Sequence, residues 1–265
     1  AEEYRRAADD CFDEDRYLRA FLDDGTPMGK KGDQACALDG IVQSFAVFCG
    51  LPREHTEIAL NTAADVLVDQ ENGVVKLFDP PFSRTDPRVG YITAYPGGVR
   101  ENGGQYTHGA VWLAMALLES GRIEEGAQVL DILNPAAKYT GRLGNLYGGE
   151  PYALAGDVYA HPACPGRVGW SQYTGSAGWF YTAVMGCLLG LRPQGDRLLL
   201  QPRLPDGWPG WELEIRLRDT LMTIAVSRGE RGMLVDGEPA AFVPLDGRPH
   251  RVELTVKAAE ENPHQ

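Results

Sequence analysis

Residues 97–108 place a guanidinium, a carboxylate and an amide between two glycine pairs and an imidazole after them, in the order Gly-Gly-Val-Arg-Glu-Asn-Gly-Gly-Gln-Tyr-Thr-His. An apolar run follows at once, so His108 is expected on the first turn of a buried helix. Binding pockets collect a few convergent polar groups on mostly apolar walls. Arg100, Glu101 and His108 are therefore candidates for ligand binding, with a purely structural His108 as the alternative.

A second segment, residues 173–179, has a sequence suited to binding an anion. It consists of Tyr-Thr-Gly-Ser-Ala-Gly-Trp and leads into another apolar run, and the free N–H groups at a helix start bind anions well. Gly175 would let a ligand approach the backbone closely. Thr174 or Ser176 can cap such a helix, so the alternative is an ordinary helix start with small residues for packing.

Two further segments carry weaker signals. Asp13 lies between a helical and an extended stretch, where an aspartate is more often a helix cap than a catalytic acid. Residues 25–31, Gly-Thr-Pro-Met-Gly-Lys-Lys, are superficially like a nucleotide-binding P-loop. They are one residue short, however, and lack the Ser or Thr that would hold magnesium. We interpret them as a turn.

The cysteines and histidines indicate neither a disulfide framework nor a metal site. The five cysteines are odd in number and include no Cys-x-x-Cys pair, and the chain has no His-Glu-x-x-His motif. These features are typical of reduced thiols, so we expect a cytoplasmic protein without a metal. The cysteines are Cys11, Cys36, Cys49, Cys164 and Cys187.

Acidic residues outnumber basic ones by 37 to 25, which gives a net charge of −12. This charge repels nucleic acid, so no nucleic-acid partner is expected. The charged first residues argue against a signal peptide, and Ala1 in place of Met suggests a fragment or a processed product. Residues 168–191 carry no charge, but their apolar part, from Ala177, is too short to span a membrane.

The elements that must position these residues form two regions. Up to about Leu191, helices that are apolar all round alternate with amphipathic ones, as residues 109–118 and 122–133 show. Residues 41–49 and 52–70 repeat this alternation, which a double-layered α/α barrel requires. The long loops at residues 80–105 and 134–174 would form its rim, and long ordered loops are usually functional.

The C-terminal region indicates β-structure. Residues 213–218 alternate strictly between apolar and charged, so Leu213, Ile215 and Leu217 are expected to face a core. Residues 221–226, 233–235 and 252–256 have strand character, and Asp236-Gly237 is a hairpin-turn pair. The predicted class is α+β: later helices of an (α/α)6 barrel (1–191), a small antiparallel β-sandwich (192–258) and a polar tail (259–265).

Taken together, several segments resemble the inverting glycoside phosphorylases of glycoside hydrolase family ninety-four. This family includes cellobiose, chitobiose and oligoglucan phosphorylases and the C-terminal part of cyclic β-1,2-glucan synthases. The most specific segments are RENGGQYTH (100–108) and WSQYTGSAGW (170–179). The others are AFLDDGTPMG (20–29), LDGIVQSFAV (38–47), DILNP (131–135), EPYALAGDVYA (150–160) and residues 190–213.

The resemblance implies roles for individual residues. Asp13 matches the general acid, and Arg100 and Glu101 match residues that bind the acceptor-side sugar. Glu150 matches a position at the sugar site, and His108, Thr174 and Gly175 match phosphate-binding positions.

The implied reaction is phosphorolysis of a β-glucoside, either a disaccharide or a β-glucan, to an α-sugar 1-phosphate. Inorganic phosphate is the nucleophile and co-substrate, and no cofactor is implied. The family's full chain is much longer, so the resemblance also implies an upstream half of the same enzyme as a partner, and a homodimer is possible. The alternatives are an inverting hydrolase on the same barrel and a non-catalytic carbohydrate-binding remnant.

Overall fold

The protein is described by a computed structural model that covers residues 1–83, 87–230 and 232–257. The chain divides into two compact units, Ala1–Ala183 and Val184–Gln265, which are described separately below. The expected polar tail, 259–265, lies outside the described residues.

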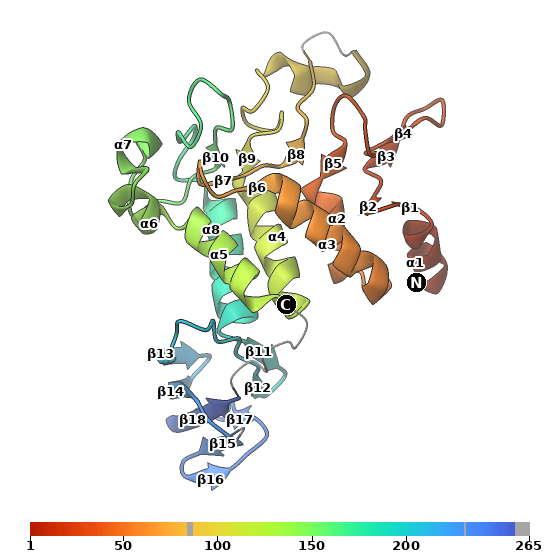
Figure 1. Cartoon of the computed structure of the whole chain (residues 1–265). Coiled ribbons are helices and arrows are strands. Elements are labelled where there is room, and N and C mark those ends of the chain that lie inside the picture. The colour runs from red at the N-terminus through yellow and green to blue at the C-terminus, as the bar shows by residue number, and fades with distance from the viewer. Residues whose placement is uncertain (84–86, 231, 258–265) are drawn as a thin grey trace. The chain divides into compact units, whose positions relative to one another are not determined.

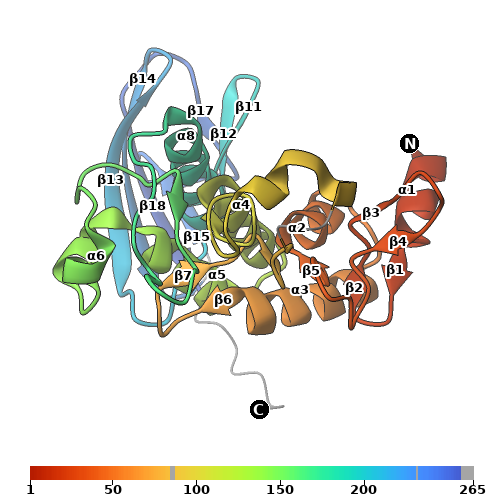
Figure 2. The ribbon, with the colours of Figure 1, turned by 90° about the horizontal axis from the view of Figure 1, so that it is seen from above.

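The N-terminal unit is built around one buried helix, α4 (Thr107–Glu119). It packs against α2 (Gly40–Phe48), α5 (Ile123–Leu133) and α8 (Thr174–Thr182), as Figures 1 and 2 show. The remaining helices of this unit are α1 (Glu2–Asp9), α3 (Arg53–Leu67), α6 (Pro135–Thr140) and α7 (Gly144–Tyr147), with the 3-10 segment η1 (Pro87–Ala94).

The predicted difference between buried and amphipathic helices is confirmed for α4 and α5. Val111, Ala114 and Leu117 have no exposed surface, whereas α5 buries one face that includes Gly126. A Cβ at Gly126 would lie 2.6 Å from Leu118 Cγ, so glycine allows the two helices to pack closely. The closed (α/α)6 barrel remains a prediction, since these helices form a layered group of neighbours.

Short two-residue strand pairs connect the helices and bring distant loops together. The pair β9 (Gln105–Tyr106) and β10 (Asp157–Val158) is the most important for the site. The hairpin β3 (Ala20–Phe21) and β4 (Pro27–Met28) encloses Gly25, whose φ of 83° confirms a turn there. The other pairs are β1 (Phe12–Asp13) with β2 (Arg16–Tyr17), β5 (Leu38–Asp39) with β8 (Phe78–Asp79), and β6 (Val68–Asp69) with β7 (Val74–Val75).

The apolar run from Ala177, which is too short to span a membrane, is not one continuous α-helix. Helix α8 ends at Thr182, a π-helical turn, η2 (Ala183–Leu188), follows, and strand β11 begins at Leu191. Only Ser176 of α8 is buried, and Tyr181 is 62% exposed. Helix α8 packs on α4, and the run becomes buried only after α8, at Ala183, Cys187 and Leu188.

The C-terminal unit contains two sheets that share one apolar core. Strands β11 (Leu191–Gln194), β12 (Arg197–Leu200) and β17 (Val243–Pro244) form the smaller sheet. The larger has the order β13 (Gly210–Leu217), β14 (Thr220–Arg228), β18 (His250–Val256), β15 (Gly232–Val235) and β16 (Glu238–Pro239). The core joins Leu198 and Val243 of one sheet to Ile224 and Val252 of the other.

The expectation of a purely antiparallel sandwich needs one correction. Strands β14 and β18 pair in parallel, because the chain between them forms β15, β16 and β17 before it returns in the direction of β14. The predicted Asp236-Gly237 hairpin turn is confirmed by positive φ angles of 54° and 86°.

His250 lies between two carboxylates at the start of β18. Its Nδ1 is 2.7 Å from Asp236 Oδ2, and its Nε2 is 3.0 Å from Asp246 Oδ1. Burial alone lowers the pKa of His250, but the hydrogen bonds to the two aspartates outweigh this effect, so the pKa is raised. The imidazolium therefore ties the β15–β16 turn and the preceding loop to β18.

We predict that His250→Gln lowers the thermal midpoint by about 3–5 °C at pH 6 and hardly at all at pH 9. A raised folded-state pKa gives stabilisation that is complete below the unfolded value of about 6.5 and disappears as the pH rises through the folded value. Thermal unfolding of both proteins at the two pH values checks this. An equal loss at pH 6 and pH 9 would show that the charge of His250 is unimportant.

Candidate active site

The β9–β10 pair brings the two predicted binding segments together. Asp157 pairs with Tyr106, and Thr107 N donates to Gly156 O over 3.0 Å. Gly156 N in turn donates to Trp170 O over 2.6 Å. The loop at 97–108 and the segment at 168–175 thus lie side by side, although about 60 residues separate them along the chain.

His108 meets the first turn of α8. A Cβ built on Gly175 would lie 2.6 Å from His108 Nε2, so the imidazole approaches the α8 backbone as closely as glycine permits. His108 Nδ1 is buried and has no hydrogen-bond partner in the described part of the chain. Burial lowers the pKa of His108, which favours the neutral imidazole at neutral pH.

The N-terminus of α8 is open to a ligand. Thr174 and Gly175 are exposed, and within the described residues no side chain caps the helix. The expectation that Thr174 or Ser176 acts as the cap was wrong: the N-cap position is Tyr173, and Ser176 Oγ donates to Tyr173 O over 3.1 Å. His108, Thr174 and Gly175 therefore form one group around free helix N–H groups, which is the arrangement an anion requires.

Arg100 and Glu101 lie on a tight turn held by Asn102. Arg100 adopts a φ of 51°, and Asn102 is fully buried. Asn102 Oδ1 accepts from Phe82 N over 2.8 Å, while its Nδ2 donates to Phe82 O over 3.1 Å and to Tyr95 O over 2.9 Å. The turn is thereby fixed to the neighbouring loop, and the positions of the two charged residues are fixed with it.

Glu101 lines a cavity of about 530 Å³. Its wall also includes Arg19 and Asp39, whose Nε and Oδ2 atoms form an ion pair 2.8 Å apart. The remaining wall is largely aromatic and aliphatic, with Tyr91 and Tyr106 among its polar members. A mostly apolar wall with a few charged groups suits a ligand that has both hydroxyl groups and apolar C–H faces.

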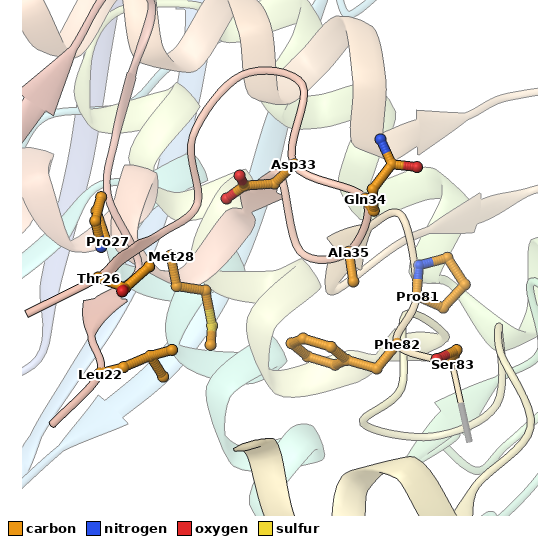
Figure 3. Close-up of a pocket in the computed structure, with 10 residues that line it drawn as sticks. All are labelled: Leu22, Thr26, Pro27, Met28, Asp33, Gln34, Ala35, Pro81, Phe82 and Ser83. Atoms are coloured by element: carbon orange, nitrogen blue, oxygen red, sulfur yellow. The ribbon is translucent and has the colours of Figure 1, made fainter. Parts of the chain in front are cut away.

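A second cavity, of about 460 Å³, lies beside the first and shares Met28 and Phe82 with it. Figure 3 shows it between the β3–β4 hairpin, the loop that carries Asp33 and Gln34, and the segment at 81–83. Asp33 Oδ2 accepts from the backbone N–H groups of Gly29 and Lys30, so this carboxylate holds its own loop in place.

Glu150 lies beside the segment that precedes α8. Gln172 Nε2 donates to Glu150 Oε1 over 3.3 Å. Hydrogen bonds, first from its own backbone and then from Ser171, lower the pKa of Glu150. The structure thus places Glu150 beside the segment that leads into α8.

Asp13 lies outside the group that contains His108. It lies on β1, beside α1 and away from α8 in both views (Figures 1 and 2). Its Oδ2 is 3.9 Å from Lys30 Nζ, and its neighbour Phe12 stacks on His55 of α3.

Sequence reasoning missed several residues of the site. Arg100 lies between the rings of Tyr95 and Trp170, with its guanidinium carbon 5.3 and 5.0 Å from their centroids. The Oδ1 atom of the buried residue Asp157 accepts from Trp170 N over 2.9 Å. The abundance of aromatic residues in the long loops was a signal for Trp170, whereas an isolated Asp157 gave none.

Comparison with known proteins assigns the chain to a family. Residues 2–190 match the model described as "Glycosyl hydrolase 94 superfamily, catalytic domain". The chain belongs to the glycosyl hydrolase 94 superfamily. Residues 191–252 match "Glycosyl hydrolase family 65, C-terminal domain". The resemblance seen in the sequence is therefore confirmed.

Curated relatives of this glycosyl hydrolase 94 chain include one synthase and several phosphorylases. It is 42% identical over 234 residues to the cyclic beta-(1,2)-glucan synthase NdvB of Rhizobium meliloti, covering 88% of this chain and 8% of the synthase. It is 29% identical to the solabiose phosphorylase of Paenibacillus borealis, covering 92% of this chain and 33% of that enzyme. It is 27% identical to the N,N'-diacetylchitobiose phosphorylase of Vibrio furnissii, covering 84% of this chain and 28% of that enzyme.

The described residues contain neither a candidate metal site nor a candidate membrane-spanning helix. Over residues 1–83, 87–230 and 232–257, no group of three or more His, Cys, Asp or Glu side chains is placed to hold a metal ion. Over the same ranges, no helix combines the length and the apolar character needed to cross a membrane.

Proposed function

We propose that this chain is part of an inverting glycoside phosphorylase that converts a β-glucoside and inorganic phosphate into an α-sugar 1-phosphate. One observation carries the proposal: the imidazole of His108 lies against the uncapped N-terminus of α8, while Arg100 of the same loop contacts Trp170 in the segment before α8. The phosphorylase names of several relatives support it, and the synthase NdvB suggests a β-glucan as substrate.

In the proposed reaction, phosphate bound at α8 attacks the anomeric carbon. The new bond joins a phosphate oxygen to that carbon, the glycosidic C–O bond breaks, and a general acid protonates the leaving oxygen. An inverting hydrolase needs a second carboxylate to activate water. An anion-binding group made of His108, Thr174 and Gly175 would take the place of that base and favours phosphorolysis over hydrolysis.

The direct test of this proposal is a product assay. The purified protein, alone and together with the proposed upstream half, would be incubated with β-linked glucose disaccharides or glucans, with and without inorganic phosphate. Phosphate-dependent release of an α-sugar 1-phosphate supports the proposal. Release of free sugar without phosphate would favour an inverting hydrolase, and binding without any product would favour a non-catalytic carbohydrate-binding protein.

The partners follow from the same proposal. Beyond the sugar and phosphate, apolar side chains of α2 and α8 such as Phe45 and Trp179 are 42% and 39% exposed. Exposed apolar patches usually find a partner. We propose that further helices of the predicted barrel cover them, in an upstream half of the enzyme or in a homodimer.

We propose that Asp13 is the general acid, as the family resemblance implies. A lost general acid costs about 10²–10⁴-fold in rate. The acid and the nucleophile act on opposite faces of the sugar in an inverting reaction, so Asp13 need not lie beside His108. We predict that Asp13→Asn lowers phosphorolysis of an unactivated disaccharide by about 10²–10⁴-fold.

Initial rates of the Asp13→Asn variant, with Glu14→Gln as the control, check this prediction. A loss of a hundredfold or more in Asp13→Asn alone would identify Asp13 as the acid, as the resemblance implies. A loss of less than about tenfold in Asp13→Asn would overturn this assignment.

A further inference from the structure

Trp170 presents a partly open indole at the edge of the candidate site. The side chain is 52% exposed, although the guanidinium carbon of Arg100 lies 5.0 Å from its ring centroid. Tyr173 contacts the indole edge-on, with the centroids 6.3 Å apart. The ring is thus supported on one side and at one edge, and half of its surface remains available to a ligand.

The backbone of Trp170 is fixed by Asp157. Trp170 N donates to Asp157 Oδ1 over 2.9 Å, and Trp170 O accepts from Gly156 N over 2.6 Å. Asp157 is only 2% exposed, and its Oδ2 has no hydrogen-bond partner within the part of the chain that the structure describes. A buried carboxyl oxygen without a partner is costly, and a fold tends to keep such a cost where function requires the geometry.

Gly169 makes this arrangement possible. A Cβ at this position would lie 2.3 Å from Asp157 Oδ2, so any larger residue would displace either the carboxyl group or Trp170. Gly169, Asp157 and Trp170 therefore act as one unit that sets the plane of the indole ring.

We propose that Trp170 is the stacking platform for a glucosyl unit of the substrate bound beside Arg100 and Glu101, and that Asp157 is its positioning residue. This proposal rests on the proposed function. A β-linked glucose ring carries its hydroxyl groups around its rim and exposes apolar C–H faces, which suit the open face of an indole. Arg100 and Glu101, next to the ring, would then meet hydroxyl groups at the rim.

The experiment compares Trp170→Ala and Trp170→Phe with the control Trp208→Ala, which removes a 40% exposed tryptophan of the C-terminal unit. The probe is a β-linked glucose disaccharide, and its dissociation constant is measured by calorimetry. We expect about a tenfold weaker affinity for Trp170→Ala, a partial loss for Trp170→Phe and no change for the control. In turnover assays, the Michaelis constant for sugar should rise and that for phosphate should stay constant.

Asp157→Ala and Asp157→Asn test the positioning role. The amide of Asn can still accept from Trp170 N, so Asp157→Asn should retain sugar affinity within about twofold, whereas Asp157→Ala should lose it as Trp170→Ala does. If Asp157→Asn retains the sugar affinity, the residue acts by positioning Trp170 and its charge is not required. Equal loss in both variants would overturn the positioning role.

Failure of this proposal is distinguishable from failure of the proposed function. Unchanged sugar affinity in Trp170→Ala would overturn the platform even if the protein is an active phosphorylase. If the protein shows no phosphorolysis but its disaccharide affinity still depends on Trp170, the proposed function is refuted. The role of Trp170 as a stacking platform is then retained. A parallel rise of both Michaelis constants would show that Trp170 only maintains the fold of the site.

Discussion

The Gly175→Ala variant is expected to bind inorganic phosphate about 10- to 100-fold more weakly than the unaltered protein. The added methyl group would start 2.6 Å from His108 Nε2, so either the imidazole or the start of α8 must move. Both groups are proposed to hold the phosphate, and loss of a hydrogen bond to a charged group costs about 1.5–3 kcal/mol.

The chain offers a matched control on the same helix. Gly178 also lies in α8, but a Cβ there would meet no atom within 4 Å, so Gly178→Ala should leave phosphate binding unchanged. The measurements are the dissociation constant for phosphate and its Michaelis constant at saturating sugar. His108→Ala should weaken the binding of phosphate more than the binding of sugar. If Gly175→Ala binds phosphate normally, or only the sugar constants change, the anion site has been misplaced.

The second large effect is expected for Asn102→Ala, which should lower the free energy of unfolding by about 2–4 kcal/mol. The side chain is fully buried and satisfies three backbone groups, the N–H and C=O of Phe82 and the C=O of Tyr95. Alanine would leave these groups without their partner. Because the turn carries Arg100 and Glu101, sugar affinity should fall in parallel.

Urea unfolding of Asn102→Ala, Asn102→Asp and Asn61→Ala tests this explanation. Asp keeps an acceptor for Phe82 N but points its second oxygen at two carbonyl groups, so it should be at least as destabilising as Ala. Asn61 is exposed on α3 and serves as the control with no expected loss. A change below about 0.5 kcal/mol in Asn102→Ala would mean that this turn is held by other contacts.

The sequence was most informative where local pattern decides structure. The apolar run at 109–118 and the amphipathic run at 122–133 predicted α4 and α5, and strict alternation predicted β13. The parallel pairing of β14 with β18 depends on where the chain returns after β15, β16 and β17, which no local pattern encodes.

The same distinction applies to the site. Arg100, His108 and Gly175 lie in segments distinctive enough to be singled out, and the structure brings the last two into contact. Asp157 and Trp170 become neighbours only through long-range backbone pairing. Asp13 matches a family position in sequence. Its place on the β1–β2 hairpin and its contact with Lys30 could not be predicted from that match.

The buried Nδ1 of His108 has a thermodynamic consequence for the proposed phosphate site. Since burial lowers the pKa of this imidazole, the empty site holds it mainly neutral at neutral pH. A phosphate anion bound against Nε2 favours the imidazolium and draws a proton from solvent onto the ring. Binding is then linked to proton uptake, so the heat measured would vary with the ionisation enthalpy of the buffer, and affinity would fall with rising pH even though phosphate itself becomes more negative.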